Sequence, residues 1–205
     1  MSLANILKES TKEAHAIAES KPFQQAMLGG DIELKLLGKY FVQLHAIHEA
    51  IENHFETHSQ VAEILAWNES RCHSRNLESD LRALNMWEDF EILDITQDFI
   101  NEIKNEVTKS ANSIIAFFYV LEGSMNGNSY IVRSIRSKNM DSNCEFNYFD
   151  PYGQEQRNEW MMFRDQLDKV KLESHQEAAM VSCASRMFEV IGLISDQIMT
   201  APAVA

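Results

Sequence analysis

The sequence predicts an all-α fold, and three observations support this. The 205 residues include only three prolines and seven glycines, so few positions interrupt a helix. Apolar residues recur at intervals of three and four over long stretches, which is the period of one helix face. No stretch alternates apolar and polar residues in the manner of a half-buried strand. The length fits a single domain, which we assign to residues 1–200, with 201–205 as a flexible tail.

The first helix is expected over residues 3–20. Its buried stripe would consist of Leu7, Thr11, Ala14 and Ala18. The pair Lys21-Pro22 ends it, because the residue before a proline disfavours helical backbone angles.

The second helix, over residues 32–58, is the most regular in the sequence. Gly30 or Asp31 can cap its start. The apolar stripe at helical spacing consists of Leu37, Phe41, Leu44, His48, Ile51 and Phe55.

Five further helices follow from the same periodicity. They are expected over residues 70–85, 93–109, 111–137, 154–171 and 174–199. Residues 138–153 contain Asn, Asp, Pro and Gly among scattered aromatics, and we predict the main loop there.

Composition narrows the classes of partner and compartment. The formal net charge is −13, which disfavours nucleic acids and anionic membranes as partners, because both are polyanions. No uninterrupted apolar run approaches the ~20 residues that a membrane span needs. Residues 1–8 lack the pattern of a secretion signal. The three cysteines are widely spaced and match no zinc motif, so we expect reduced thiols in a cytoplasmic protein.

Two segments carry candidate chemistry. His15 lies at the edge of the first helix's apolar stripe, in the run Leu7-Lys8-Glu9-Ser10-Thr11-Lys12-Glu13-Ala14-His15-Ala16-Ile17-Ala18-Glu19. A neutral imidazole is a good iron ligand, and a hydrogen-bonded boundary histidine is the structural alternative.

The second segment is Leu121-Glu122-Gly123-Ser124-Met125-Asn126-Gly127-Asn128. Each mid-helix glycine costs about 1 kcal/mol relative to alanine. Either close helix packing or a flat ligand lying against the backbone would offset that cost.

Together these segments resemble the proximal and distal helices of heme oxygenases of the bacterial type. The spacing of residues 44–52, 77–81 and 160–164 is also similar to that family, so the resemblance covers most of the chain in order. It implies a single-domain helical bundle with a kinked distal helix. It also implies cleavage of heme to biliverdin, carbon monoxide and ferrous iron.

The resemblance assigns roles to individual residues. His15 would bind the heme iron, and Glu19 would orient its ring. Lys8 and Arg164 match residues that hold heme propionates, and Tyr119 lies one residue from a propionate-binding tyrosine. Gly123 and Gly127 would form the distal wall of the heme pocket. A further match, Phe188, is expected to serve in packing.

The distal segment departs from the animal-type pattern at two positions. Ser124 stands where those enzymes have an aspartate that anchors a water network, and Asn128 replaces a further glycine. His48 stands where they have a tyrosine that bonds those waters. We hypothesise that His48 and Ser124, with Asn128, hold these waters here. A core histidine bonded to a backbone carbonyl is the alternative for His48.

Heme would be both substrate and cofactor. The reaction would also use O2 and an external electron donor, such as ferredoxin or flavodoxin with its reductase. Arg133, Arg136 and Lys138 at the end of the distal helix either complement the helix dipole or form a local basic dock for such a donor.

Two other functions remain open at this point. One is a non-catalytic heme- or bilin-binding protein, which would keep the heme pocket but not the turnover. The departures at Ser124 and Asn128 keep that possibility open. A di-iron carboxylate oxidase would need inward Glu and Glu-x-x-His sets on several helices. The candidate ligands His45, His48, Glu49, Glu52, His54 and His58 all fall on one helix.

Overall fold

The computed structural model describes residues 1–139 and 143–200. Within these ranges all the regular elements are helices, which confirms the predicted fold class. The elements are α1 (Leu3–Ser10), α2 (Lys12–Glu19), α3 (Pro22–Gly29), α4 (Leu34–Thr57), α5 (Ser59–Ile64), η1 (Glu69–Arg71), α6 (His73–Ala83), α7 (Asp94–Lys109), α8 (Ser113–Lys138), η2 (Gly153–Glu155), α9 (Gln156–Leu167) and α10 (Ser174–Thr200). The expected tail, 201–205, lies outside the described residues.

The first helix is divided, contrary to the prediction of one helix over 3–20. Thr11 separates α1 from α2, with φ −101° and ψ 2°. Its Oγ1 donates a hydrogen bond to the Leu7 carbonyl at 2.8 Å, a local bond of the kind that competes with regular helix. Three residues of the predicted stripe, Leu7, Thr11 and Ala18, are nevertheless buried, and the fourth, Ala14, is half-buried.

Two short helices escaped prediction. α3 begins at Pro22, where the fixed φ of proline suits the first helical turn. It ends at Gly30, whose φ of +73° is left-handed. A Cβ on Gly30 would lie 2.6 Å from the Ser134 backbone, so only glycine allows this close contact with α8. α5 has six residues, too few to show a helical period.

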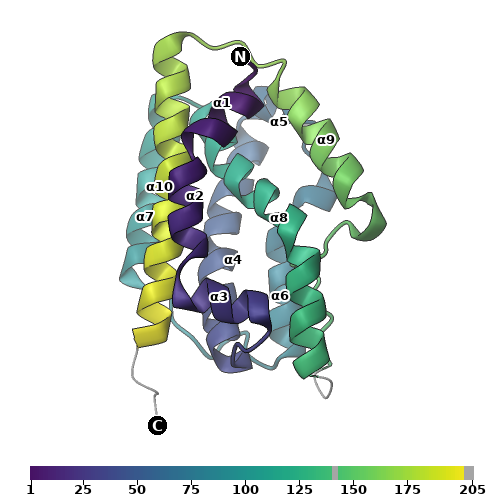
Figure 1. The fold of residues 1–205 in the computed structure, drawn as a ribbon. Coiled ribbons are helices and arrows are strands. Elements are labelled where there is room, and N and C mark those ends of the chain that lie inside the picture. The colour runs from purple at the N-terminus through teal and green to yellow at the C-terminus, as the bar shows by residue number, and fades with distance from the viewer. Residues whose placement is uncertain (140–142, 201–205) are drawn as a thin grey trace.

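The remaining helices follow the predicted order, and α4 and α10 form the centre of the core. All six residues of the α4 stripe are buried. Helix α10 packs against α1, α2, α3, α4, α7 and α8. It is also long and apolar enough to cross a membrane by length and composition, as buried core helices often are. Figure 1 shows α10 beside α7, with α4 deeper in the molecule.

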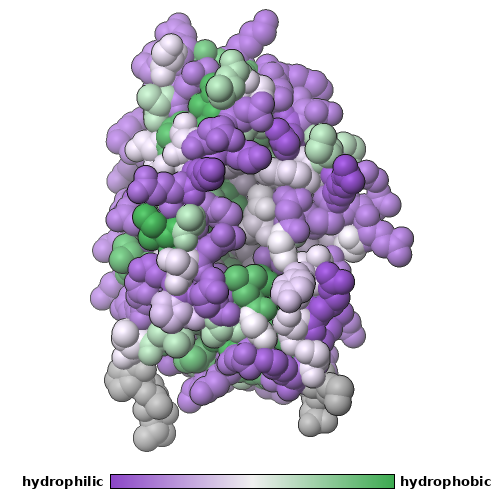
Figure 2. Space-filling view, viewed as in Figure 1, coloured by the Kyte–Doolittle hydropathy of each residue, from purple (hydrophilic) through white to green (hydrophobic). Residues whose placement is uncertain are grey.

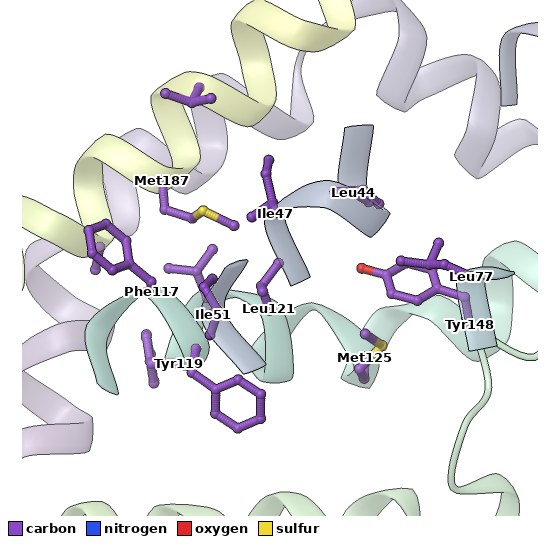
Figure 3. Close-up of a cluster of buried hydrophobic side chains, with 14 of the residues drawn as sticks. Leu44, Ile47, Ile51, Leu77, Phe117, Tyr119, Leu121, Met125, Tyr148 and Met187 are labelled. Carbon is purple, nitrogen blue, oxygen red and sulfur yellow. The ribbon is translucent and has the colours of Figure 1, made fainter. Parts of the chain in front are cut away.

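Helix α8 crosses the molecule diagonally in front of α4 and then changes direction beside α6 (Figure 1). This bend agrees with the expected kinked distal helix. Figure 3 shows side chains from α4, α8 and α10 meeting in the core behind it, including Ile47, Leu121 and Met187.

Candidate functional site

A cleft lies between α2 and α8. It consists of two adjoining cavities of about 400 and 520 Å³. The two cavities share His15 from α2, Gly123 and Ser124 from α8, and Phe188 from α10 among their lining residues. Figure 2 shows this face hollowed near its centre, within a mostly hydrophilic rim. The two sequence segments singled out above therefore line the same cleft.

His15 lines the α2 side of the cleft. Half of its side chain is exposed, and its Nε2 lies 3.2 Å from Glu19 Oε1, one helical turn away. The Phe188 ring contacts the imidazole edge-on, with ring centroids 5.0 Å apart. A carboxylate on one ring nitrogen fixes the tautomer and leaves the other nitrogen available to a ligand.

The two glycines of α8 differ in their surroundings. A Cβ on Gly127 would meet no protein atom within 4 Å, whereas a Cβ on Gly123 would lie 3.3 Å from the Trp160 ring. Close helix packing therefore does not explain Gly127. A flat ligand on the backbone fits this residue, because Gly127 lines the first cavity, as His15 does.

Cations gather in the second cavity. Lys8 and Arg164 both line it, as predicted, and Lys12 joins them. Tyr119 lines the same cavity, and burial raises the pKa of its hydroxyl although the nearby Arg164 opposes that shift. The arrangement suits carboxylate groups of a ligand, which need charge-assisted partners.

Polar side chains from α8 face the first cavity. Ser124 Oγ donates to the Leu121 carbonyl at 2.7 Å. Asn128 is 8% exposed, and its Nδ2 donates a weak hydrogen bond to Met125 Sδ at 3.5 Å. Both residues line the cavity and can bond further groups there.

His48 is not among the residues that line the cleft, so the hypothesis that it helps to hold distal waters requires a residue between them. Its side chain is fully buried, and its Nε2 lies 3.1 Å from the Tyr148 hydroxyl. Tyr148 follows α8 in the chain and itself lines the first cavity, so it stands between His48 and the cleft. Figure 3 shows Tyr148 entering the core with its hydroxyl leading. The alternative of a carbonyl partner is also not seen, because a phenol fills that position.

Four lining residues escaped sequence reasoning or were assigned to packing alone. Tyr148 sits in a segment without helical period, Lys12 is of a type common on surfaces, and Trp160 is of a type that usually packs in a core. Phe188, expected to serve in packing, contacts His15 and lines both cavities.

A buried ionic cluster lies behind α8. Glu122, the residue before Gly123, is 1% exposed and pairs with Arg71 from η1. His73 Nε2 lies 3.1 Å from Glu122 Oε2, and the Tyr152 hydroxyl donates to Glu122 Oε1 at 2.8 Å. Burial alone would raise the pKa of Glu122, but the bonds from His73 and the Arg71 charge lower it. The cluster fixes the glycine segment of α8 from the side opposite the cleft.

Two other sequence hypotheses are weakened by the structure. Arg136 pairs with Glu145 and Lys138 with Asp31, whereas Arg133 is exposed and outside these pairs, so only part of the expected basic dock is engaged in ion pairs. For the di-iron alternative, residues 1–139 and 143–200 contain no group of three His, Cys, Asp or Glu side chains placed to hold a metal ion.

Comparison with known proteins gives one consistent result. The sequence profile of the family described as heme oxygenase matches residues 1–195. The chain is 28% identical over 124 residues to a heme oxygenase of Porphyra purpurea and 27% identical over 121 residues to heme oxygenase 1 of a Nostoc strain. These matches cover 58% and 57% of this chain, and 52% and 51% of those relatives. The chain thus spans about half the length of the curated relatives it matches.

Solved structures agree on the fold. Heme oxygenase from Leptospira interrogans superposes with a TM-score of 0.85 at 19% identity, covering 96% of this chain and 100% of that one. Heme oxygenase-1 from Synechocystis in complex with heme gives a TM-score of 0.87 at 16% identity, covering 96% and 92%. With the profile match over nearly the whole sequence, these findings show that the chain belongs to the heme oxygenase family.

Proposed function

We propose that this protein is a heme oxygenase that cleaves heme to biliverdin, carbon monoxide and ferrous iron. The observation that carries the proposal is the open space at Gly127, on the cleft wall of α8, in the same cavity that His15 lines.

The residues present fit the group that this activity requires. His15 offers a ring nitrogen while Glu19 holds the other. Lys8 and Arg164, with Lys12 and Tyr119 beside them, would hold the two propionates. When bound, heme supplies both the iron that activates O2 and the ring that is opened.

The protein's own groups would control position and protons. Gly123 and Gly127 carry no side chain into the distal side of the cleft, so that O2 would have room. Ser124 and Asn128 would anchor ordered water there, and His48 would act on that water through Tyr148. An external donor, ferredoxin or flavodoxin with its reductase, would supply electrons. We place the enzyme in the cytoplasm, as one domain over residues 1–200.

Hemin titration followed by reduction tests the proposal. The protein with hemin should give the Soret band of a histidine-ligated heme. Ascorbate, or ferredoxin with its reductase, should convert this band to biliverdin absorption. A Soret band that never converts would show a heme-binding protein without turnover and would refute the proposed activity.

A further inference from the structure

Three buried or half-buried side chains connect the cleft to the first turn of α6. Tyr148 lines the cleft, and its hydroxyl lies 3.1 Å from His48 Nε2. His48 Nδ1 lies 3.4 Å from Glu52 Oε1, and these two side chains are 0% and 9% exposed. Among the described residues His48 Nδ1 makes no hydrogen bond of good geometry, so this contact with Glu52 is where its proton can be directed. A carboxylate, an imidazole and a phenol thus lie in series.

Glu52 is held in its ionised form by the start of α6. The Ser74 backbone N–H donates to Glu52 Oε1 at 3.0 Å, and the Ser74 hydroxyl donates to Oε2. A helix N-terminus stabilises a carboxylate through its free N–H groups and its dipole. Burial alone would raise the pKa of Glu52, but the bonds from His48 and Ser74 outweigh it and lower the pKa. An ionised carboxylate only accepts hydrogen bonds.

The ionised Glu52 determines which nitrogen of His48 carries the proton. Burial lowers the pKa of His48, although Glu52 opposes that shift, so the imidazole is neutral at neutral pH. An unprotonated Nδ1 is a hydrogen-bond acceptor and would face the carboxylate of Glu52, which is also an acceptor. A protonated Nδ1 can instead donate to Glu52. Nε2 is then the acceptor, and the Tyr148 O–H must donate to it.

Other charged groups around His48 do not reverse this assignment. His73 from α6 contacts the His48 ring edge-on, with ring centroids 5.8 Å apart. Glu122 from α8 acts on His48 from farther away and favours its protonated form, whereas His73 disfavours it. Glu122 already has Arg71, His73 and Tyr152 as partners.

We propose that Glu52 is a positioning residue that, through His48, turns the Tyr148 O–H away from the cleft, so that the phenol oxygen meets the cleft as a hydrogen-bond acceptor. The Ser124 hydroxyl lies beside that oxygen, but its one proton goes to the Leu121 carbonyl, so the donor to the phenol oxygen would be a group bound in the cleft. The Tyr148–His48–Glu52 series therefore has a defined direction. If His48 takes up a proton, both its nitrogens donate, and the Tyr148 O–H is released toward the cleft.

This inference rests on the proposed function for its purpose, but its test does not. In the ¹⁵N-histidine-labelled full chain without heme, long-range ¹H–¹⁵N spectra at neutral pH should show the Nδ1–H tautomer for His48. The His48→Gln variant assigns the signals. Tyr148→Phe should shift the Nε2 resonance, because the hydrogen bond to it is lost.

Substitutions of Glu52 separate positioning from simple packing. Glu52→Gln keeps a carbonyl acceptor without the charge, so the tautomer should persist while the pKa of His48 falls. Glu52→Leu removes the acceptor and should move the proton to Nε2. Glu49→Gln, an exposed substitution on the same helix, serves as the matched control and should change neither property.

The outcomes are distinct from those of the turnover assay. An Nε2–H or doubly protonated His48 in the wild-type chain at neutral pH would overturn the inference, even if biliverdin forms normally. An Nδ1–H tautomer in a protein that makes no biliverdin would support the series and refute the activity alone.

Discussion

Gly127 lowers the stability of α8 but leaves space for a ligand in the cleft. It lies within a 26-residue helix, and a Cβ placed on it would meet no protein atom within 4 Å. The sequence suggested that this residue and His15 face one ligand, and the two residues line the same cavity. It could not identify Tyr148, because nothing in an aperiodic loop predicts which side chain turns into the core. For the same reason the sequence did not reveal that Tyr148 lies between His48 and the cleft.

Gly127→Ala should therefore stabilise the protein without heme by about 0.5–1 kcal/mol, because alanine is the better helix former. The same methyl group should weaken hemin binding and slow turnover, since it occupies the space opposite His15. Urea unfolding and hemin titration measure the two effects. Gly123→Ala is the comparison, because its methyl group would press on Trp160 at 3.3 Å. A Gly127→Ala protein that binds hemin normally would contradict the proposal that heme occupies the space at this residue.

At the scale of elements, long helices were predictable and short ones were not. Helix α4 has 24 residues and a complete stripe, whereas α3 has eight and α5 six. The division at Thr11 depends on one side-chain hydrogen bond, which periodicity does not reveal. Packing between elements also depends on ion pairs between residues far apart in the sequence, which periodicity cannot predict. The main example is Glu122, which contacts Arg71 and His73.

Glu122→Ala should destabilise the fold by about 3–5 kcal/mol, because it leaves the buried Arg71 charge without its main partner. Replacing both residues, as Arg71→Met with Glu122→Leu, should cost less than the sum of the single changes. Urea unfolding of the four proteins gives the comparison. Additive losses would mean that the two side chains do not act as a pair.

For the whole molecule, buried ionisable groups make stability depend on pH. The folded-state pKa of His48 lies below its ordinary value of 6.5, and those of Glu52 and Glu122 lie below 4.5. The unfolded chain then binds more protons than the folded one as pH falls through these ordinary values. Stability is therefore present above them and is lost on acidification.

His48→Gln removes one of these groups and isolates the contribution of His48 to the pH dependence of stability. As pH falls below 6.5, the wild type should lose stability relative to the variant, by at most about 1.4 kcal/mol per pH unit. Paired urea titrations at several pH values measure the gap between the two proteins. A gap that stays constant across this range would show that His48 does not titrate differently in the folded state.

The distribution of charge over the molecule leads to a second expectation. The chain carries a net charge of −13, yet Lys8, Lys12 and Arg164 converge on the cleft. Wild type should bind hemin more tightly than hemin dimethyl ester, which lacks the propionate charges. Lys8→Ala with Arg164→Ala should reduce this preference by roughly tenfold, the effect expected for lost charge-assisted hydrogen bonds. Lys35→Ala, an exposed change on α4, should leave the preference intact.

The binding of heme iron by His15 is tested most directly by hemin complexes of wild type and His15→Ala, followed by absorption and electron paramagnetic resonance. We expect the wild-type spectra of an imidazole-ligated ferric heme, their loss in His15→Ala, and their return when free imidazole is added. His175→Ala, an exposed change on α10, should match wild type. A His15→Ala complex with unchanged imidazole-ligated spectra would contradict the placement of heme between α2 and α8.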